Sequence, residues 1–239
     1  MLILALETSG LQGSIALSRG GVIVSRQLAR EGRRHAQTLT LEIHELLRDQ
    51  QVAPQDLDAV AVSLGPGSFT GLRVGLVCAK TLAYALQCRL VGVETYQAVA
   101  TCAAAHDPTL GETGSRLLVV GDAQRGDMFL AEYVRHTDRG WMRQGEHRIV
   151  PAETWLAALE PADIVIGPGV TRVPDGATRA RVIREPWSIQ PSAASICELA
   201  QSRITLAAVD DPWTLAPIYL RPSAAEEQRD LKDAQKLGG

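Results

Sequence analysis

The chain has 239 residues, of which 46% are hydrophobic and 21% charged, a composition that excludes an intrinsically disordered protein. Its formal net charge is −3 and aromatic residues make up only 4%, so it lacks the basic excess and the stacking residues of a protein that binds nucleic acid strongly by itself. The most apolar stretch, Leu72 to Leu86, is interrupted by Arg73 and Lys80 and is too short for the roughly 20 residues of a membrane span.

The sequence also carries no sign of export. Met1 to Leu6 is apolar, but it has no basic lead-in and runs directly into Glu7, unlike a secretory signal. The four cysteines form no CxxC pair, so we expect reduced, buried thiols. These features predict a cytoplasmic protein.

The first half of the chain predicts three strands followed by alternating helices and strands. Short apolar runs favour the strands, and Gly20-Gly21 between the second and third is typical of a hairpin. Apolar residues at helical spacing favour the helices. In chain order, the expected elements are strands over residues 1–6, 13–18 and 22–28, a helix over 35–50, a strand over 57–64, a helix over 72–87, a strand over 89–93 and a helix over 96–105.

The second half repeats this order after a connector that is rich in Pro, Gly and Thr. We expect strands over residues 116–121, 127–135 and 141–150, a helix over 152–159, strands over 162–166 and 181–184, and a helix over 193–204. The repeat predicts an α/β protein with two lobes of related topology. The lobes would cover residues 1–105 and 106–222, with the helix over 192–204 able to pack back on the first lobe, and a polar tail over 223–239.

One candidate binding site lies where the first strand ends. Glu7, Thr8 and Ser9 offer a carboxylate and two hydroxyls, which could meet a phosphate or a hydrated Mg²⁺ ion. Gly65 and Gly67 precede a helix whose free N–H groups would favour an anion. An ordinary turn, with glycines that only permit close packing, is the alternative.

The helix over residues 72–86 has almost no polar face. Such a helix is either buried on all sides or awaits a partner, and Gly75 and Ala79 would permit another backbone to approach closely. No HxxH or HxxxH pair is present, so no helical metal site is expected, and there is no GxSxG nucleophile motif.

Several of these segments together resemble the TsaB (YeaZ) family. The central run from Leu57 to Leu76, followed by Ala79-Lys80, resembles the signature of that family. Met1 to Ser9 resembles its opening strand, with Glu7 where the family usually has Asp. Further landmarks of the resemblance are Arg34-His35, Asp122 to Asp127 and Pro217 to Arg221.

The resemblance implies the two-lobed fold of actin, Hsp70 and sugar kinases (ASKHA), in which each lobe is a mixed sheet with helices. It also implies a function. The related TsaD transfers a threonylcarbamoyl group to adenosine 37 of tRNA, making t6A, and carries a metal-binding HxxxH. In this chain those two positions are Thr95 and Val99, which cannot hold the metal as histidines do. The resemblance therefore implies no metal, no cofactor and no catalytic residue.

It implies instead a non-catalytic subunit that binds and activates TsaD, with TsaE as a further partner, and that forms a homodimer when alone. The partner-binding residues would lie on two apolar helices: His35, Leu39, Leu72, Gly75, Leu76, Ala79, Leu82, Ala83 and Leu86. A vestigial nucleotide or phosphate site would comprise Glu7, Thr8, Ser9, Gly65 and Gly67. An ATPase or kinase-like enzyme is the alternative, and a glycoprotease is a third interpretation that would need the missing HxxxH.

Overall fold

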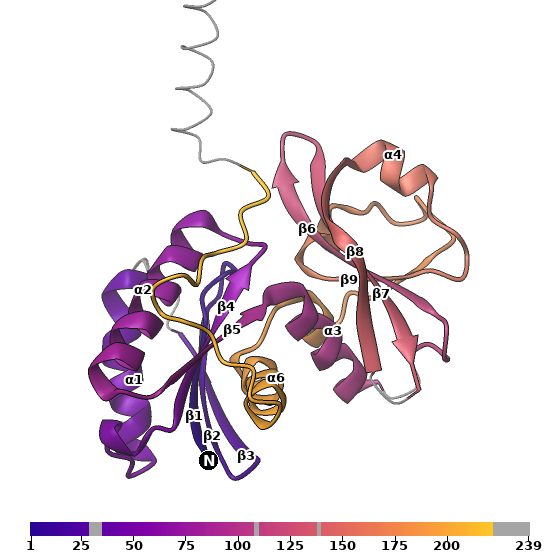
Figure 1. Ribbon diagram of the computed structural model, residues 1–239. Helices are drawn as coiled ribbons and strands as arrows, with labels where there is room; N and C mark the ends of the chain where they lie inside the picture. Colours follow the sequence, from indigo (N-terminus) through magenta and orange to yellow (C-terminus); the bar gives the residue numbers. More distant parts are fainter. Residues whose placement is uncertain (29–34, 108–109, 138–139, 222–239) are drawn as a thin grey trace, which may run out of the picture.

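Two five-stranded mixed sheets make up the fold (Figure 1). The structure, a computed structural model, describes residues 1–28, 35–107, 110–137 and 140–221. The first sheet contains β1 (Leu2–Glu7), β2 (Ser14–Arg19), β3 (Val22–Gln27), β4 (Ala59–Gly65) and β5 (Arg89–Glu94). The second contains β6 (Arg116–Gln124), β7 (Asp127–His136), β8 (Gly140–Pro151), β9 (Ile164–Ile166) and β10 (Arg181–Val182).

The helices cover the faces of these sheets. They are α1 (His35–Asp49), α2 (Phe69–Leu86), α3 (Thr95–His106), α4 (Ala152–Ala157), α5 (Pro186–Ile189) and α6 (Ala193–Thr205), with 3₁₀ turns η1 (Pro54–Asp56) and η2 (Pro168–Arg172). The predicted helices and strands are present with small shifts at their ends. The short elements η1, η2 and α5 were not expected, and Arg34 and the polar tail lie outside the described residues.

The two sheets share one strand order, β3-β2-β1-β4-β5 in the first and β8-β7-β6-β9-β10 in the second. In each, the first strand is central, antiparallel to the second strand and parallel to the fourth. This arrangement confirms the predicted α/β fold with two related lobes.

The central strand β1 divides its side chains between two cores. Because successive side chains point to opposite faces of a strand, Leu4 and Leu6 join a core of leucines and valines under α1 and α2. Ile3 and Ala5 face the other way, where small side chains let α6 lie close to the sheet. Thus α6, from near the end of the described chain, covers the first sheet.

Helix α3 contributes to the packing of both lobes. Ala98 belongs to the core between the first sheet and α6, whereas Val99 and Ala103 belong to the core of the second sheet. The Tyr96 hydroxyl lies so close to Gly121 in β6 that a Cβ atom there would collide with it. The glycine therefore allows α3 to sit against the second sheet.

Helix α2 is long and apolar enough to cross a membrane, judged by length and composition alone. It has 18 residues and a mean hydropathy of 1.2, and it begins three residues earlier than predicted because Ser68 caps it. Core helices of soluble proteins pass the same test, and α2 packs one face on the first sheet. The helix is therefore weak evidence for a membrane.

A partly buried polar cluster lies between the start of α3 and β8. Glu94 Oε2 is 3.1 Å from Arg143 Nε and 3.8 Å from His147 Nε2. Burial, with a contribution from the Arg143 charge, lowers the pKa of His147 to about 4. The imidazole is therefore neutral at pH 7, and its contact with Glu94 is not an ion pair.

We predict that His147 makes the protein acid-sensitive. Its folded-state pKa lies below the ordinary 6.5, so the unfolded state binds the extra proton and the free energy of unfolding should fall as pH drops from about 6.5 towards 4. His147→Gln cannot titrate and should lose this part of the decline. Urea unfolding across that pH range measures it, and a variant profile parallel to the parent profile would contradict the prediction.

Candidate functional site

The first strand ends in a fully buried carboxyl group. Glu7 Oε1 accepts hydrogen bonds from the Ser9 backbone N–H and from Ser9 Oγ, both at 2.5 Å. Its Oε2 is also buried and has no hydrogen-bond partner among the described residues. Burial raises the pKa of Glu7 above its ordinary 4.5, against the opposing hydrogen bonds from Ser9. The protonated form is therefore the one that the fold favours.

The glycine-rich loop after β4 closes over the residues that follow Glu7. The Ser68 N–H donates to the Ser9 carbonyl at 2.7 Å, and Thr8 Oγ1 donates to the Gly71 carbonyl at 2.8 Å. A Cβ atom on Gly67 would lie 2.6 Å from the Ser9 carbonyl oxygen. The chain itself thus fills the space where an anion would approach the start of α2.

The structure therefore brings together the residues predicted as a vestigial phosphate site, but in a closed arrangement. Ser9 contacts both Glu7 and Gly67, and the later segment passes close to Gly65, where a Cβ atom would lie 2.9 Å from the Ile218 carbonyl oxygen. This geometry supports the close-packing alternative for the glycines. Nucleotide binding here stays a prediction.

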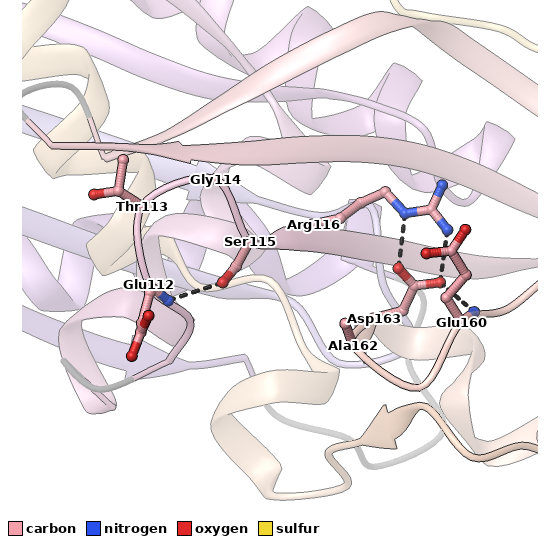
Figure 2. Close-up of a pocket in the computed structure, with 8 residues that line it drawn as sticks. All are labelled: Glu112, Thr113, Gly114, Ser115, Arg116, Glu160, Ala162 and Asp163. Carbon is pink, nitrogen blue, oxygen red and sulfur yellow. Dashed lines mark hydrogen bonds and ion pairs between the residues drawn. The ribbon is translucent and has the colours of Figure 1, made fainter.

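A separate open hollow of about 480 Å³ lies at one end of the second lobe (Figure 2). Its charged wall is internally paired: Arg116 donates to both Asp163 oxygens at 2.7 and 2.6 Å. Its other lining residues include Glu112 and Glu160 but no histidine or cysteine. Its two hydroxyl groups, on Ser115 and Thr113, bond to the Glu112 N–H and to Thr137 rather than to a base, and the hollow is not lined by the loop after β1.

The predicted partner-binding residues lie mostly inside the protein's own core. Six of them are buried: Leu39, Leu72, Gly75, Leu76, Ala79 and Ala83. Leu82 and Leu86 are half-buried, and nothing is described for the side chain of His35. Gly75 is approached by Thr8 of the same chain rather than by a partner backbone. These buried residues cannot contact a partner directly, because the helix uses that face to cover the sheet.

The opposite face of α2 is exposed and carries large side chains. Val77 and Tyr84 are 63% and 61% exposed, and the Tyr84 ring meets that of Trp213, which is 79% exposed. At the start of the helix, Arg73 lies 3.9 Å from the centre of the Phe69 ring and donates to Tyr219 Oη at 2.9 Å. We call these residues the α2 surface: Phe69, Arg73, Val77, Tyr84, Trp213 and Tyr219.

The sequence-based interpretation missed Trp213 and Tyr219 as part of this surface. Both come from the segment after α6, about 130 residues beyond α2 in the sequence. The available signal was two aromatic residues in the short segment after the last predicted helix, in a chain with only 4% aromatic residues.

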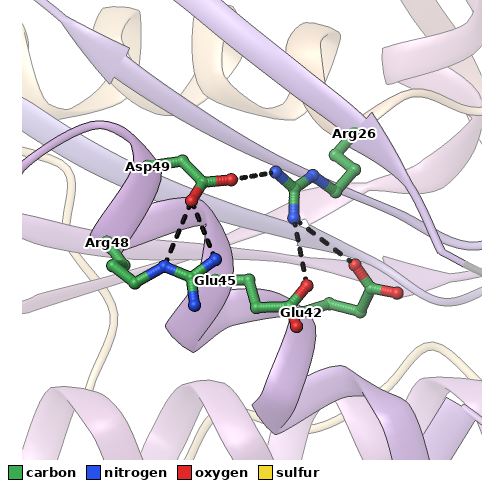
Figure 3. A network of polar contacts seen from close by, with 5 residues as sticks. All are labelled: Arg26, Glu42, Glu45, Arg48 and Asp49. Carbon is green, nitrogen blue, oxygen red and sulfur yellow. Dashed lines mark hydrogen bonds and ion pairs between the residues drawn. The ribbon is translucent and has the colours of Figure 1, made fainter.

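Helix α1 lies beside α2 and is tied to the edge strand β3 by a charge network (Figure 3). Arg26 contacts Asp49 at 2.7 Å, Glu45 at 3.5 Å and Glu42 at 3.8 Å. Hydrogen bonds from Arg26 and then Arg48 lower the pKa of Asp49. This network fixes the polar face of α1 to β3, while the apolar face of the helix packs in the core of the first sheet.

A family model and two solved structures show which class of proteins this chain resembles. The family model described as "TsaD: tRNA N6-adenosine threonylcarbamoyltransferase" matches residues 17–155. Two solved structures from Pseudomonas aeruginosa share the fold: a protein with similarity to peptidase YEAZ (TM-score 0.77, 26% identity, 92% of this chain and 99% of that one) and YeaZ (0.75, 25%, 91% and 100%). The chain thus has an actin-like fold of the TsaD-related class.

The curated relatives narrow this to one family. TsaB of Bacillus subtilis is 32% identical over 168 residues, 68% of each chain, and TsaB of Escherichia coli is 27% identical over 229 residues, 94% of this chain and 96% of its own. The chain belongs to the TsaB (YeaZ) family. Within the described part of the chain, no three His, Cys, Asp or Glu side chains gather as metal ligands.

We predict that Glu7→Gln raises the free energy of unfolding at pH 7. A carboxyl with a raised folded-state pKa stabilises the fold most below its ordinary pKa of 4.5, and that stability is lost as pH rises through the folded-state value. The amide stays neutral, so the gain should vanish below pH 4.5. Glu146→Gln, on an exposed residue, is the control. Equal stability of both variants at pH 7 would refute this assignment.

Proposed function

We propose that this protein is a non-catalytic subunit that binds and activates TsaD in the transfer of threonylcarbamoyl to adenosine 37 of tRNA. Its relatives from Bacillus subtilis and Escherichia coli are named tRNA threonylcarbamoyladenosine biosynthesis proteins, which supports a role in t6A formation. The match to the TsaD family model supports a relationship to the transferase itself.

The observation that carries the non-catalytic proposal is the closed loop over Thr8 and Ser9. An ATPase or kinase of this fold needs an accessible acid for its metal and open loops for phosphate. Here the only acid at the end of β1, Glu7, is fully buried with a raised pKa, and Gly67 lies against Ser9. A peptidase of the metal-dependent kind would need ligands where this chain has Thr95 and Val99.

The proposed contact with TsaD is the α2 surface. Exposed tyrosine, tryptophan and arginine side chains are the residues that most often dominate binding energy in protein interfaces. The same surface would join two copies of the chain when TsaD is absent, with TsaE as a further partner of the complex. A cytoplasmic location fits this role.

We predict that TsaD, TsaE, threonylcarbamoyl-adenylate and tRNA yield t6A only when this chain is added, and that the chain alone yields none. Replacing Tyr84 and Trp213 together by alanine should reduce TsaD binding roughly tenfold or more, the loss expected for central aromatic contacts, and t6A formation with it. Leu206→Ala, also strongly exposed but at the end of α6, is the control. Binding and nucleoside analysis provide the two measurements.

Two results would count against this function. Full t6A formation without the chain would show that TsaD needs no such subunit. Loss of t6A in Glu7→Gln with TsaD binding intact would show a chemical role for the carboxyl group, and the non-catalytic proposal would have to be withdrawn.

A further inference from the structure

We propose that residues 217–221 couple the α2 surface to the turn between β6 and β7, so that a partner seated on α2 biases the arrangement of the two lobes. Only the identity of that partner rests on the function proposed above. The coupling itself follows from contacts at the two ends of this short segment, which runs past α2 towards β6 (Figure 1).

The segment and the chain that leads into it are fixed to the first lobe. Asp210 accepts a hydrogen bond from the Gly92 N–H at 2.7 Å and pairs with Arg203 at 3.0 Å. Further along, the Ile218 N–H donates to the Leu64 carbonyl at 2.7 Å, at the end of β4. These bonds place the following residue, Tyr219, over the start of α2.

Tyr219 joins the segment to the α2 surface. Its ring centre is 4.7 Å from that of Phe69, and its hydroxyl accepts the hydrogen bond from Arg73 Nε. Tyr219 is 39% exposed, and Arg73 is exposed as well. A partner seated over the start of α2 would therefore touch the two residues, Phe69 and Arg73, that position Tyr219.

Two residues later, the segment reaches the second lobe. Arg221 Nη2 lies 2.5 Å from Asp127 Oδ2, and Nη1 donates to the Ala123 carbonyl oxygen. A planar guanidinium that binds a carboxylate and a carbonyl at once fixes direction as well as distance. Arg221 therefore fastens the segment to both sides of the β6–β7 turn.

That turn depends on such support. Gln124 and Arg125 adopt left-handed backbone angles, with φ of 66° and 55°. Non-glycine residues keep these conformations only when their surroundings hold them. Asp122 accepts from the Gln124 N–H at 2.6 Å and pairs with Arg172, while Arg221 supplies the contact to Asp127.

The spacing makes the link stiff. Consecutive Cα atoms are about 3.8 Å apart, so those of Tyr219 and Arg221 can be separated by at most roughly 7.6 Å. Only Leu220 lies between the two residues, so little backbone is available to absorb a shift of Tyr219 on α2 before Arg221. Because coupling between two sites is reciprocal, a change at the turn must also alter the α2 surface.

Amide hydrogen exchange of the full chain, without any partner, tests the coupling. Arg221→Ala should speed exchange at residues 122–127 roughly tenfold, as expected when a charge-assisted hydrogen bond that holds a turn is lost. Arg73→Ala should speed exchange at the same amides, although the contacts described for Arg73 are with Phe69 and Tyr219 and not with that turn. Arg179→Ala, an exposed arginine of the second lobe, is the matched control and should leave the turn unchanged.

Each other outcome overturns the proposal. Unchanged exchange at the turn in Arg221→Ala would show that this arginine does not hold it. Faster exchange in Arg221→Ala but not in Arg73→Ala would show that Arg221 holds the turn but that changes at the α2 surface do not reach it. Since TsaD is absent from the experiment, these results stand apart from the reconstitution of t6A formation.

Discussion

The close approach of α2 to the residues after β1 is the constraint on which the rest of the structure depends. Thr8 fills the space beside Gly71 and Gly75, so any larger side chain at either glycine would collide with it. This contact sets α2 on the central strand of the first sheet. It closes the space at the start of the helix, and it turns the opposite face of α2 outward.

In the second lobe, too, glycines allow a turn to pack closely beside the central strand. Gly167-Pro168-Gly169 follows β9 as Gly65-Pro66-Gly67 follows β4, and Gly65 and Gly167 have nearly equal φ angles of 108° and 104°. A Cβ atom on Gly169 would lie 2.9 Å from the backbone of Gly121 in β6. In both lobes, a glycine turn lets the chain cross closely beside the central strand. The two Gly-Pro-Gly turns therefore mark the related topology of the lobes.

The sequence predicted the elements of this fold well, because short apolar runs and helical spacing record local packing directly. It could not predict which face of α2 is buried. Leu76 and Val77 are equally apolar in the sequence, yet one packs on the sheet and the other is 63% exposed. Gly75 and Ala79 indicated that another part of a chain lies close to α2, but not that this part is Thr8 of the same chain. The contact between Arg221 and Asp127 joins residues 94 apart in the chain, and no spacing rule foretells it.

Replacing Gly71 by alanine tests this constraint most directly. Helix propensity alone would make the variant more stable by up to about 1 kcal/mol. The collision with the Thr8 carbonyl oxygen predicts the opposite sign, a loss of about 2 kcal/mol in the free energy of unfolding. Gly10→Ala is the control, since its Cβ would meet nothing closer than 3.7 Å and should change stability by less than about 0.5 kcal/mol. A Gly71→Ala variant as stable as the parent protein would contradict the account.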